Sequence, residues 1–185
     1  FRSPHHSASA EGILGGGKTV RPGEISLAHL GVLFLDEAPE FRSDVLKALR
    51  EPLEDSVVTI SRAEGALRLP ADFQLIMAAN PCPCGRLGAV PGSGGGTELS
   101  TCFCSGEEIN RHWRRLGAAL LDRVELRVPI VAEGPLGTGR SGEESSRVVA
   151  ERVRAAVEAQ RRRFAGTSVR RNARMPAGLM DRHCA

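Results

Sequence analysis

Apolar and polar positions follow one another in a pattern that predicts strands alternating with helices. Residues 32–35 form an unbroken apolar run and residues 73–79 form a second, mostly apolar run, both typical of short buried strands. Apolar residues recur at helical spacing over 43–53, which predicts a helix with Ser43 as its N-cap and an end or kink at Pro52. This order of elements indicates the α/β fold class.

The remainder of the chain adds a hairpin, further helices and a third strand. The expected elements are a β-hairpin with strands at 57–60 and 66–69, a helix capped by Ser105, a strand at 124–128, an amphipathic helix at 143–164 and a helix that begins after Pro176. Glycine and proline are frequent at 133–142, which predicts a linker. We therefore expect one region at 1–132 and a second, helical region at 143–185.

Two carboxylates, Asp36 and Glu37, follow the first apolar run at its C-terminal end. Ligands of open α/β sheets bind beyond the carboxyl ends of the strands. A P-loop ATPase uses such a pair there, because the Asp holds the Mg²⁺ of Mg-ATP and the Glu orients or deprotonates the attacking water. Asn80, after the second run, could hydrogen-bond a γ-phosphate or that water. The alternatives are a solvated acidic turn and an Asn-Pro turn.

Residues 12–19 match the phosphate-loop pattern G-x-x-x-x-G-K-[ST], but their surroundings argue against that role. A phosphate loop follows a buried strand and opens a helix, so that backbone N–H groups face the phosphates. No core strand is predicted before this stretch, and Pro22 and Gly23 would stop a helix after it. We therefore favour a chance match, with a phosphate role for Lys18 as the alternative.

Four of the five cysteines form two close pairs on either side of a glycine-rich loop, and they are Cys82, Cys84, Cys102 and Cys104. Four thiolates suit a tetrahedral Zn²⁺, which would also give the connector a reason to be ordered. Reduced thiols without a metal are the alternative. Disulfides are the least favoured, because no secretory context is evident. Cys184 has no predicted partner. His5, His6 and His29 lack ligand spacing, so we expect surface or capping roles for them.

Basic charge is concentrated in one half of the chain. Residues 1–60 hold six Lys/Arg and nine Asp/Glu, whereas residues 140–174 hold ten Arg and four Glu. This asymmetry indicates a polyanionic partner such as DNA, or else a solvated helix face. Arg62 and Arg68 on the predicted hairpin could grip a phosphate backbone, or simply be solvated. Arg123 could reach the γ-phosphate of a neighbouring subunit, or form a surface salt bridge.

The composition limits the class of protein. The chain has 185 residues, of which 41% are apolar and 25% charged, as is ordinary for a soluble globular protein with a core. No apolar run approaches the roughly 20 residues that span a bilayer, and no secretory leader opens the chain. We therefore expect a cytoplasmic protein without membrane association. The abrupt start at Phe1 suggests a piece of a longer protein.

The chain resembles the magnesium-chelatase-like AAA+ ATPases of the YifB/ComM type. The resemblance covers essentially the whole sequence and rests on residues 1–6, 15–17, 21–29, 31–37, 79–85, 102–104 and 120–123. It implies a P-loop NTPase of the AAA+ class, a three-layer α/β core with a β-hairpin insertion and a cysteine-paired insertion at 82–104. Residues 143–185 would begin a C-terminal helical lid.

The resemblance also implies roles for individual residues. Asp36 and Glu37 would be the Walker B pair, Asn80 the sensor 1 residue and Arg123 the arginine finger. The hairpin around Arg62 resembles a pre-sensor hairpin that faces the central pore of related helicases. Lys18 departs from the family pattern. The phosphate loop and the sensor 2 arginine of the family would lie outside residues 1–185, so we expect this chain alone to bind ATP poorly.

The whole protein would then be a hexameric ring motor that hydrolyses ATP with Mg²⁺. The resemblance implies action on DNA, in branch migration during uptake and recombination of foreign DNA. A chelatase-type motor that drives metal insertion into a tetrapyrrole is the first alternative. A non-catalytic, zinc-bearing nucleic-acid-binding module is the second, and its DNA binding would survive neutralisation of Asp36 and Glu37 but not removal of zinc.

Overall fold

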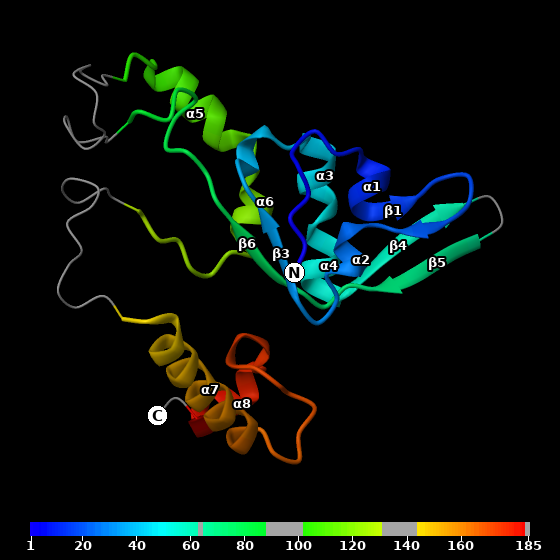
Figure 1. The fold of residues 1–185 in the computed structure, drawn as a ribbon. Helices are drawn as coiled ribbons and strands as arrows, with labels where there is room; N and C mark the ends of the chain where they lie inside the picture. Colours follow the sequence, from blue (N-terminus) through cyan, green and yellow to red (C-terminus); the bar gives the residue numbers. More distant parts are fainter. Residues whose placement is uncertain (63–64, 88–101, 131–143, 184–185) are drawn as a thin grey trace. The chain divides into compact units, whose positions relative to one another are not determined.

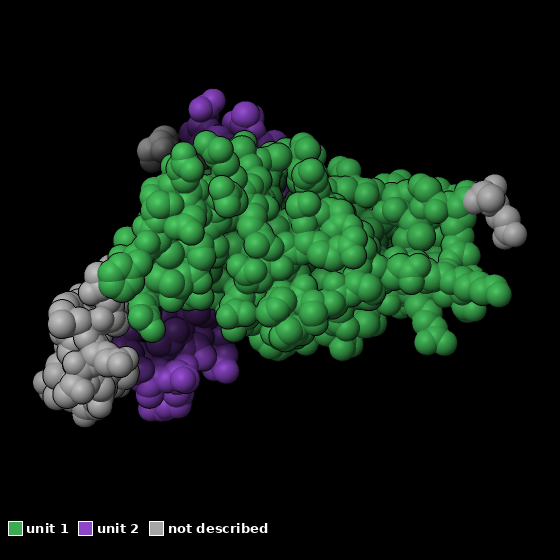
Figure 2. All heavy atoms as spheres, turned by 90° about the horizontal axis from the view of Figure 1, so that it is seen from above, with its two compact units in different colours: residues 1–136 green, residues 137–185 purple. Residues whose placement is uncertain are grey.

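The computed structural model describes residues 1–62, 65–87, 102–130 and 144–183. The chain divides into two compact units, Phe1–Leu136 and Gly137–Ala185, which are coloured green and purple in Figure 2. The division falls within 133–142, the stretch predicted to be a linker, and those residues lie outside the described part of the chain.

A parallel pair of strands, β3 (Val32–Leu35) and β6 (Gln74–Met77), lies at the centre of the first unit (Figure 1). Their register places Leu35 opposite Met77, so both strands end at the same level. On the other edge of β3, Arg2 forms a parallel bridge through two backbone hydrogen bonds of 2.8 Å. Both expected strands are present, and the fold is mixed α/β with parallel strands. The expected burial holds only for β3, whose Leu33 and Leu35 are buried, whereas β6 has no buried residue and its Ile76 is 43% exposed, because β3 is the only described strand that pairs with it.

Short helices pack around these strands. They are α1 (Ala10–Leu14), α2 (Glu24–Leu27), the 3-10 turn η1 (Ala38–Glu40), α3 (Ser43–Ala48), α4 (Arg50–Asp55), α5 (Gly106–Arg114) and α6 (Ala118–Leu121). Ile13, Ile25, Leu33, Leu46 and Leu120 are at most 2% exposed and belong to one core cluster. Each such side chain contributes about 1.5–3 kcal/mol by its burial, so this core fixes the first unit.

The helix expected over 43–53 is broken into α3 and α4 at Leu49. Pro52 explains the position of the break. A proline ring clashes with the carbonyl of the residue four positions before it, which here is Ala48, the last residue of α3. The predicted kink is therefore confirmed, although it falls one turn before the proline itself.

The prediction of Ser43 as an N-cap was wrong. Helix α3 begins at Ser43, and Arg42 occupies the cap position without a capping side-chain hydrogen bond. Asp44 organises this turn instead, because its carboxylate accepts hydrogen bonds from the Arg42 guanidinium and from the Val45 amide. These bonds lower the pKa of Asp44, with the Arg42 side chain as the main cause. A carboxylate in the first turn also complements the helix dipole.

The predicted β-hairpin is present as β4 (Val57–Arg62) and β5 (Gly65–Pro70), paired antiparallel. The register runs from Val57 opposite Pro70 to Arg62 opposite Gly65, and residues 63–64 at the tip lie outside the described part. Figure 1 shows the hairpin protruding from the body of the first unit. Its base is anchored because Val58 is 4% exposed within the core.

The stretch that matches a phosphate loop folds differently from one. Helix α1 includes the first three residues of this stretch, and β1 (Gly15–Gly16) and β2 (Arg21–Pro22) then pair antiparallel, with Lys18 in the turn between them. In the described residues 7–23, no buried strand leads into this turn and no helix opens at Lys18. The geometry therefore agrees with the interpretation of a chance match.

The strand expected at 124–128 is not formed, which corrects that prediction. Residues 124–130 have no regular secondary structure, and Leu126 and Val128 are 83% and 72% exposed. An alternating pattern yields a strand only where a neighbouring strand supplies the ladder hydrogen bonds. None of the described strands pairs with this segment.

The second unit is helical, as expected. Its described elements are α7 (Ser146–Arg163), the 3-10 turn η2 (Asn172–Arg174) and α8 (Ala177–His183). Phe164 is 3% exposed, and its ring centroid lies 5.8 Å from that of His183, which joins α7 to α8. Cys184 lies outside the described residues. Across the described part of the chain, every helix is too short or too polar to cross a membrane.

Candidate functional site

Asp36 and Glu37 lie directly beyond the carboxyl end of β3, and both are exposed. Glu37 has a φ of 49°, in the left-handed region that non-glycine residues seldom adopt. The Glu37 amide donates to Asp36 Oδ1 (2.9 Å), and the Ala38 amide donates to the Ala78 carbonyl after β6 (2.9 Å). Such a backbone conformation costs about 1–3 kcal/mol and is common at functional sites, which makes this turn a candidate site.

His6 lies beside the Glu37 carboxylate, with its Nδ1 3.3 Å from Glu37 Oε2. Because Arg2 pairs with β3, the segment that follows Arg2 carries His6 towards the carboxyl end of that strand. Its ring centroid lies 4.1 Å from that of His5 and 6.4 Å from that of Phe41. The sequence interpretation expected only a surface or capping role for His6. No spacing in the sequence could reveal this contact, because it depends on strand pairing.

Asn80 follows β6 at the same edge of the sheet, and α5 contacts its backbone. His112 Nε2 lies 3.0 Å from the Asn80 carbonyl oxygen, and Trp113 Nε1 donates to the Pro81 carbonyl (3.2 Å). His112 is 6% exposed, and its Nδ1 lies 4.0 Å from a carboxylate oxygen of Glu40. A buried polar ring requires such partners. The sequence placed His112 within a helix but gave it no role.

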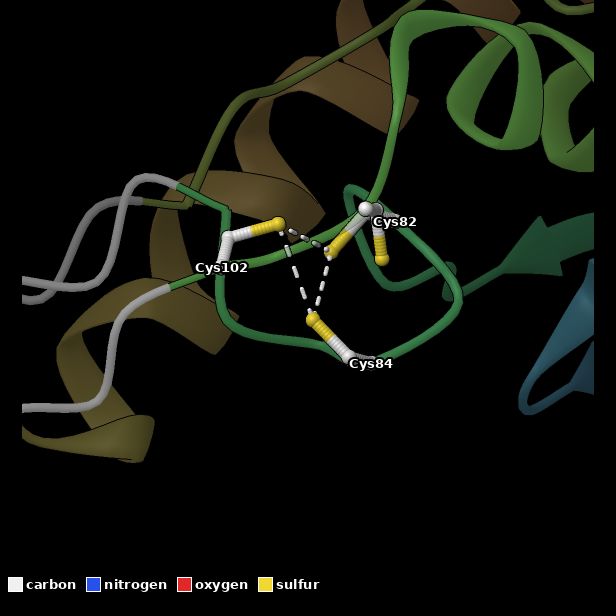
Figure 3. Close-up of side chains that lie close together, drawn as sticks. Cys82, Cys84 and Cys102 are labelled. Carbon is white, nitrogen blue, oxygen red and sulfur yellow. Dashed lines mark hydrogen bonds between the residues drawn. The ribbon is translucent and has the colours of Figure 1, made fainter.

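The four cysteines of the two pairs converge into one cluster, in which all four Sγ atoms lie within 4.8 Å of one another. Figure 3 shows three of them, Cys82, Cys84 and Cys102, with their sulfurs directed towards one another. The Sγ of Cys82 is 3.4 Å from that of Cys84 and 3.6 Å from that of Cys102. Zinc–sulfur bonds of about 2.3 Å in a tetrahedron place the sulfurs about 3.8 Å apart. The donor set therefore fits Zn²⁺, and all four cysteines, Cys104 included, are free of disulfides.

The thiols of the cluster differ in pKa, because they form different hydrogen bonds. Burial opposes ionisation of Cys82, but hydrogen bonds from the Leu87 amide and from the Cys84 and Cys102 thiols outweigh it and lower its pKa to about 6. A hydrogen bond from the Cys84 backbone favours the Cys104 thiolate, yet sharing with the neighbouring thiols and burial raise its pKa to about 12. The pKa of Cys102 is also raised, although its hydrogen bond to the Cys104 backbone opposes this. A divalent cation would replace the retained protons.

Arg123, the predicted finger, pairs with Glu54 of α4. Its Nε donates to Glu54 Oε1 (2.9 Å), and its Nη2 contacts the same oxygen. The side chains of Arg123 and Glu54 are 44% and 39% exposed. Within the described residues this is the surface salt bridge that the sequence left open as the alternative. A role of Arg123 towards a neighbouring subunit stays a prediction.

Arg62 and Arg68 both lie exposed on the hairpin. Arg62 Nη1 donates to the carbonyl of Lys18 (3.1 Å), which ties β4 to the turn between β1 and β2, and Arg68 lies opposite Thr59. The structure thus separates the predicted residues into three groups. The acidic pair and Asn80 share one sheet edge. The four cysteines form a cluster that begins two residues after Asn80. Arg62 and Arg68 lie on the hairpin, and Arg123 follows α6 and contacts α4.

Residues 1–136 match the family model described as magnesium chelatase, subunit ChlI. The chain is 42% identical over 186 residues to an uncharacterized protein YifB of Salmonella typhimurium, covering 100% of this chain and 34% of that protein. It is 48% identical over 151 residues to the competence protein ComM of Haemophilus influenzae, covering 80% of this chain and 28% of that protein. An uncharacterized protein YifB of Escherichia coli is 44% identical over 165 residues, covering 88% and 31%. The chain thus spans between 28% and 34% of the length of these curated relatives.

Proposed function

The chain belongs to the YifB/ComM-type branch of the magnesium chelatase, subunit ChlI, family, and on this premise we propose that it forms part of an ATP-hydrolysing AAA+ motor. One observation carries the proposal. The parallel register of β3 and β6 brings Asp36, Glu37 and Asn80 to the carboxyl ends of neighbouring strands, where ligands of α/β sheets bind. In this proposal the fold is a three-layer P-loop NTPase core, with β4 and β5 as a hairpin insertion and 143–185 as the start of a helical lid.

Each polar residue of this sheet edge then has a distinct task. Asp36 holds the Mg²⁺ of bound Mg-ATP, which supplies the charge neutralisation that phosphoryl transfer needs. Glu37 orients the attacking water and takes its proton, and its side chain is 52% exposed to solvent beside His6. Asn80 donates its side-chain amide to the γ-phosphate or to that water. The held backbone of Asn80 and the strained backbone of Glu37 preorganise both groups.

We propose DNA as the polyanion on which the motor acts. The protein from Haemophilus influenzae is named a competence protein, and this chain is 48% identical to it. The protruding hairpin carries Arg62 and Arg68 as exposed cations, and α7 carries three arginines in its last turn. Clustered arginines bind phosphate backbones without reading sequence. In a hexameric ring, the hairpin would face the DNA and Arg123 would reach the nucleotide of the next subunit.

A chelatase-type motor is the second candidate, because the matching family model is described as a magnesium chelatase subunit. It would use the same sheet edge for ATP, with a tetrapyrrole-inserting partner in place of DNA. A non-catalytic, zinc-bearing nucleic-acid-binding module is the third. It is favoured only by the convergence of the four thiols, and it leaves the acidic strand end without a role.

The decisive experiment measures ATP turnover by the full-length protein, alone and with single-stranded or forked DNA. Glu37→Gln is the test variant, and Glu11→Gln on α1 is the matched control, since it removes an exposed carboxylate remote from the sheet edge in sequence. We expect DNA to stimulate turnover several-fold. We expect Glu37→Gln to abolish turnover and Glu11→Gln to leave it unchanged.

The other outcomes separate the candidates. Turnover that is lost in Glu37→Gln but is indifferent to every DNA would favour the chelatase-type motor. DNA binding without any turnover, unchanged in Asp36→Asn and Glu37→Gln and lost on removal of zinc, would favour the binding module and refute the motor.

A further inference from the structure

We propose that the four-cysteine cluster positions Asn80, so that binding of a metal ion by the cysteines determines how well the Asn80 side chain contacts the γ-phosphate. This inference rests on the proposed ATPase function. It assigns to the cluster a task beyond the stability of its own insertion. The argument follows the two chain segments that join the cluster to Asn80.

The first connection is the turn that follows Asn80 directly. Only Pro81 separates Asn80 from Cys82, which is completely buried. The Gly85 amide donates to the Cys82 carbonyl (3.0 Å) and closes a turn, and Gly85 has a φ of +73°. A Cβ placed on Gly85 would lie 3.7 Å from Asn80 Cγ, so this turn packs against the Asn80 side chain itself. The position of the cluster therefore affects the position of the Asn80 side-chain amide, which would contact the γ-phosphate.

The second connection is α5, which begins as soon as the chain leaves the cluster at Cys104. Ser105 forms a capping box with Glu108, so the helix starts at a defined residue. About two helical turns later, His112 and Trp113 reach back to the carbonyls of Asn80 and Pro81. The backbone at Asn80 is thus contacted by α5, the helix that follows the second cysteine pair.

These two connections make the insertion a closed loop whose two ends both hold Asn80. Residues 88–101 are part of that loop and lie outside the described residues. Closing a loop of this length by weak contacts alone costs chain entropy, which thiolate–metal bonds offset. A metal held by Cys82, Cys84, Cys102 and Cys104 would therefore keep α5 seated on the backbone of Asn80. His112 and Trp113 position Asn80, and the metal would hold the two ends of the loop together at the cysteines.

The test uses the full-length protein and a double-mutant cycle. One variant removes two ligands, Cys84→Ser with Cys104→Ser, a second is Asn80→Ala, and a third combines them. We expect each of the first two to lower kcat about tenfold or more, and the combination to be no slower than Asn80→Ala alone. If kcat in the combined variant falls by the product of the two single effects, the proposal is overturned, because the cluster would then act independently of Asn80.

Two readouts do not depend on turnover. Zinc content should fall from one per chain to well below one in the ligand variant. Hydrogen exchange should speed up at Gly85 and Leu87, whose amides bond Cys82, and along α5. Exchange that stays unchanged around 80–87 and along α5 after metal loss would refute the positioning role.

A second variant covers the case in which loss of the ligands unfolds the chain. His112→Leu removes the bond to the Asn80 carbonyl while leaving all four cysteines, and His112→Gln restores a donor. We expect full zinc content in both, a lowered kcat in His112→Leu and partial recovery in His112→Gln. Arg111→Ala, in the same helix, is the control. Equal kcat in His112→Leu and wild type would contradict the inference.

Failure of this inference differs from failure of the proposed function. Turnover that needs Glu37 but ignores both the cysteines and His112 would refute the positioning role alone. A zinc-loaded wild-type protein without any turnover would refute both.

Discussion

His6 Nδ1 lies 3.3 Å from Glu37 Oε2, so a residue of the N-terminal segment contacts the candidate general base at the end of β3. The contact exists because the backbone of Arg2 pairs with β3 on the edge opposite to β6. Glu37 sits in a left-handed backbone conformation at φ 49°, and its carboxylate is half exposed. His6 therefore restricts the orientation of the exposed Glu37 side chain.

Removing His6 should lower turnover without weakening nucleotide binding. In the full-length protein we expect His6→Ala to reduce kcat about tenfold and to change KM less than about twofold, because Glu37 would lose its orientation but not its charge. His6→Asn should recover part of the loss, since its amide can donate to the carboxylate. His5→Ala is the matched control, because it removes the ring that lies 4.1 Å from that of His6 but leaves the contact between His6 and Glu37 in place.

Steady-state kinetics at several ATP concentrations decide this prediction. Equal kcat in His6→Ala and wild type, or an effect confined to KM, would show that the contact has no catalytic consequence. A comparable loss in His5→Ala would point to disruption of the N-terminal segment instead.

Arg123 should matter for turnover far more than for stability. Its ion pair with Glu54 is almost half exposed, and such pairs contribute about 0–1 kcal/mol. If Arg123 stabilises a neighbour's transition state, Arg123→Ala should lower kcat about 10³-fold or more with little change in the melting temperature. Arg127→Ala is the control, because within the described part of the chain the Arg127 side chain donates only to the Leu121 carbonyl.

Mixing supplies a second readout for the finger. Subunits of Arg123→Ala mixed with Glu37→Gln should regain turnover, because each variant leaves the other group intact at some interfaces. Normal turnover in Arg123→Ala would mean that Arg123 serves only in the ion pair with Glu54.

Lys18 should be dispensable for nucleotide binding. It lies in the turn between β1 and β2, where no helix presents backbone N–H groups to a phosphate. We expect Lys18→Ala in the full-length protein to bind ATP within about twofold of wild type, as measured by calorimetry, because one exposed turn charge adds little at physiological salt. Loss of binding in Lys18→Ala would reverse the interpretation of residues 12–19 as a chance match.

Zinc affinity should rise steeply with pH. The pKa of Cys104 is raised to about 12 and that of Cys102 is raised as well, so both thiols hold protons near neutrality and metal binding must release them. Release of at least two protons implies an affinity that increases about 100-fold per pH unit and falls by the same factor on acidification. Competition with a zinc chelator between pH 6.5 and 8 measures the slope. A flat profile would show that the cluster is not the metal site.

Gly23 should not tolerate a side chain. A Cβ at this position would lie 2.3 Å from the Gly15 nitrogen and 2.4 Å from the Ile13 carbonyl oxygen, both of them backbone atoms. We expect Gly23→Ala to destabilise the chain by about 1–3 kcal/mol, seen as a lowered midpoint in thermal or urea unfolding. Gly106→Ala is the control, because a Cβ there meets nothing within 4 Å. Equal midpoints would mean that the β1–β2 turn can shift without cost.

The amino-acid sequence by itself determined the elements whose signals are local. Short apolar runs defined β3 and β6, two further short runs at 57–60 and 66–69 defined the hairpin, and Ser105 defined the start of α5. The order of polar residues after these strands placed Asp36 and Asn80 at one sheet edge in advance. Hydrophobic period, capping and turn chemistry act over a few residues, and a pattern can therefore report them.

Only the tertiary structure decided the contacts between distant segments. The alternation at 124–128 predicted a strand, but no described strand lies beside it to complete the ladder, and it stays irregular. His6 meets Glu37 because Arg2 pairs with β3, and His112 meets Asn80 because α5 folds back over the cysteine turn. Pairing and packing depend on which partner is available in space, and residue spacing carries no record of that.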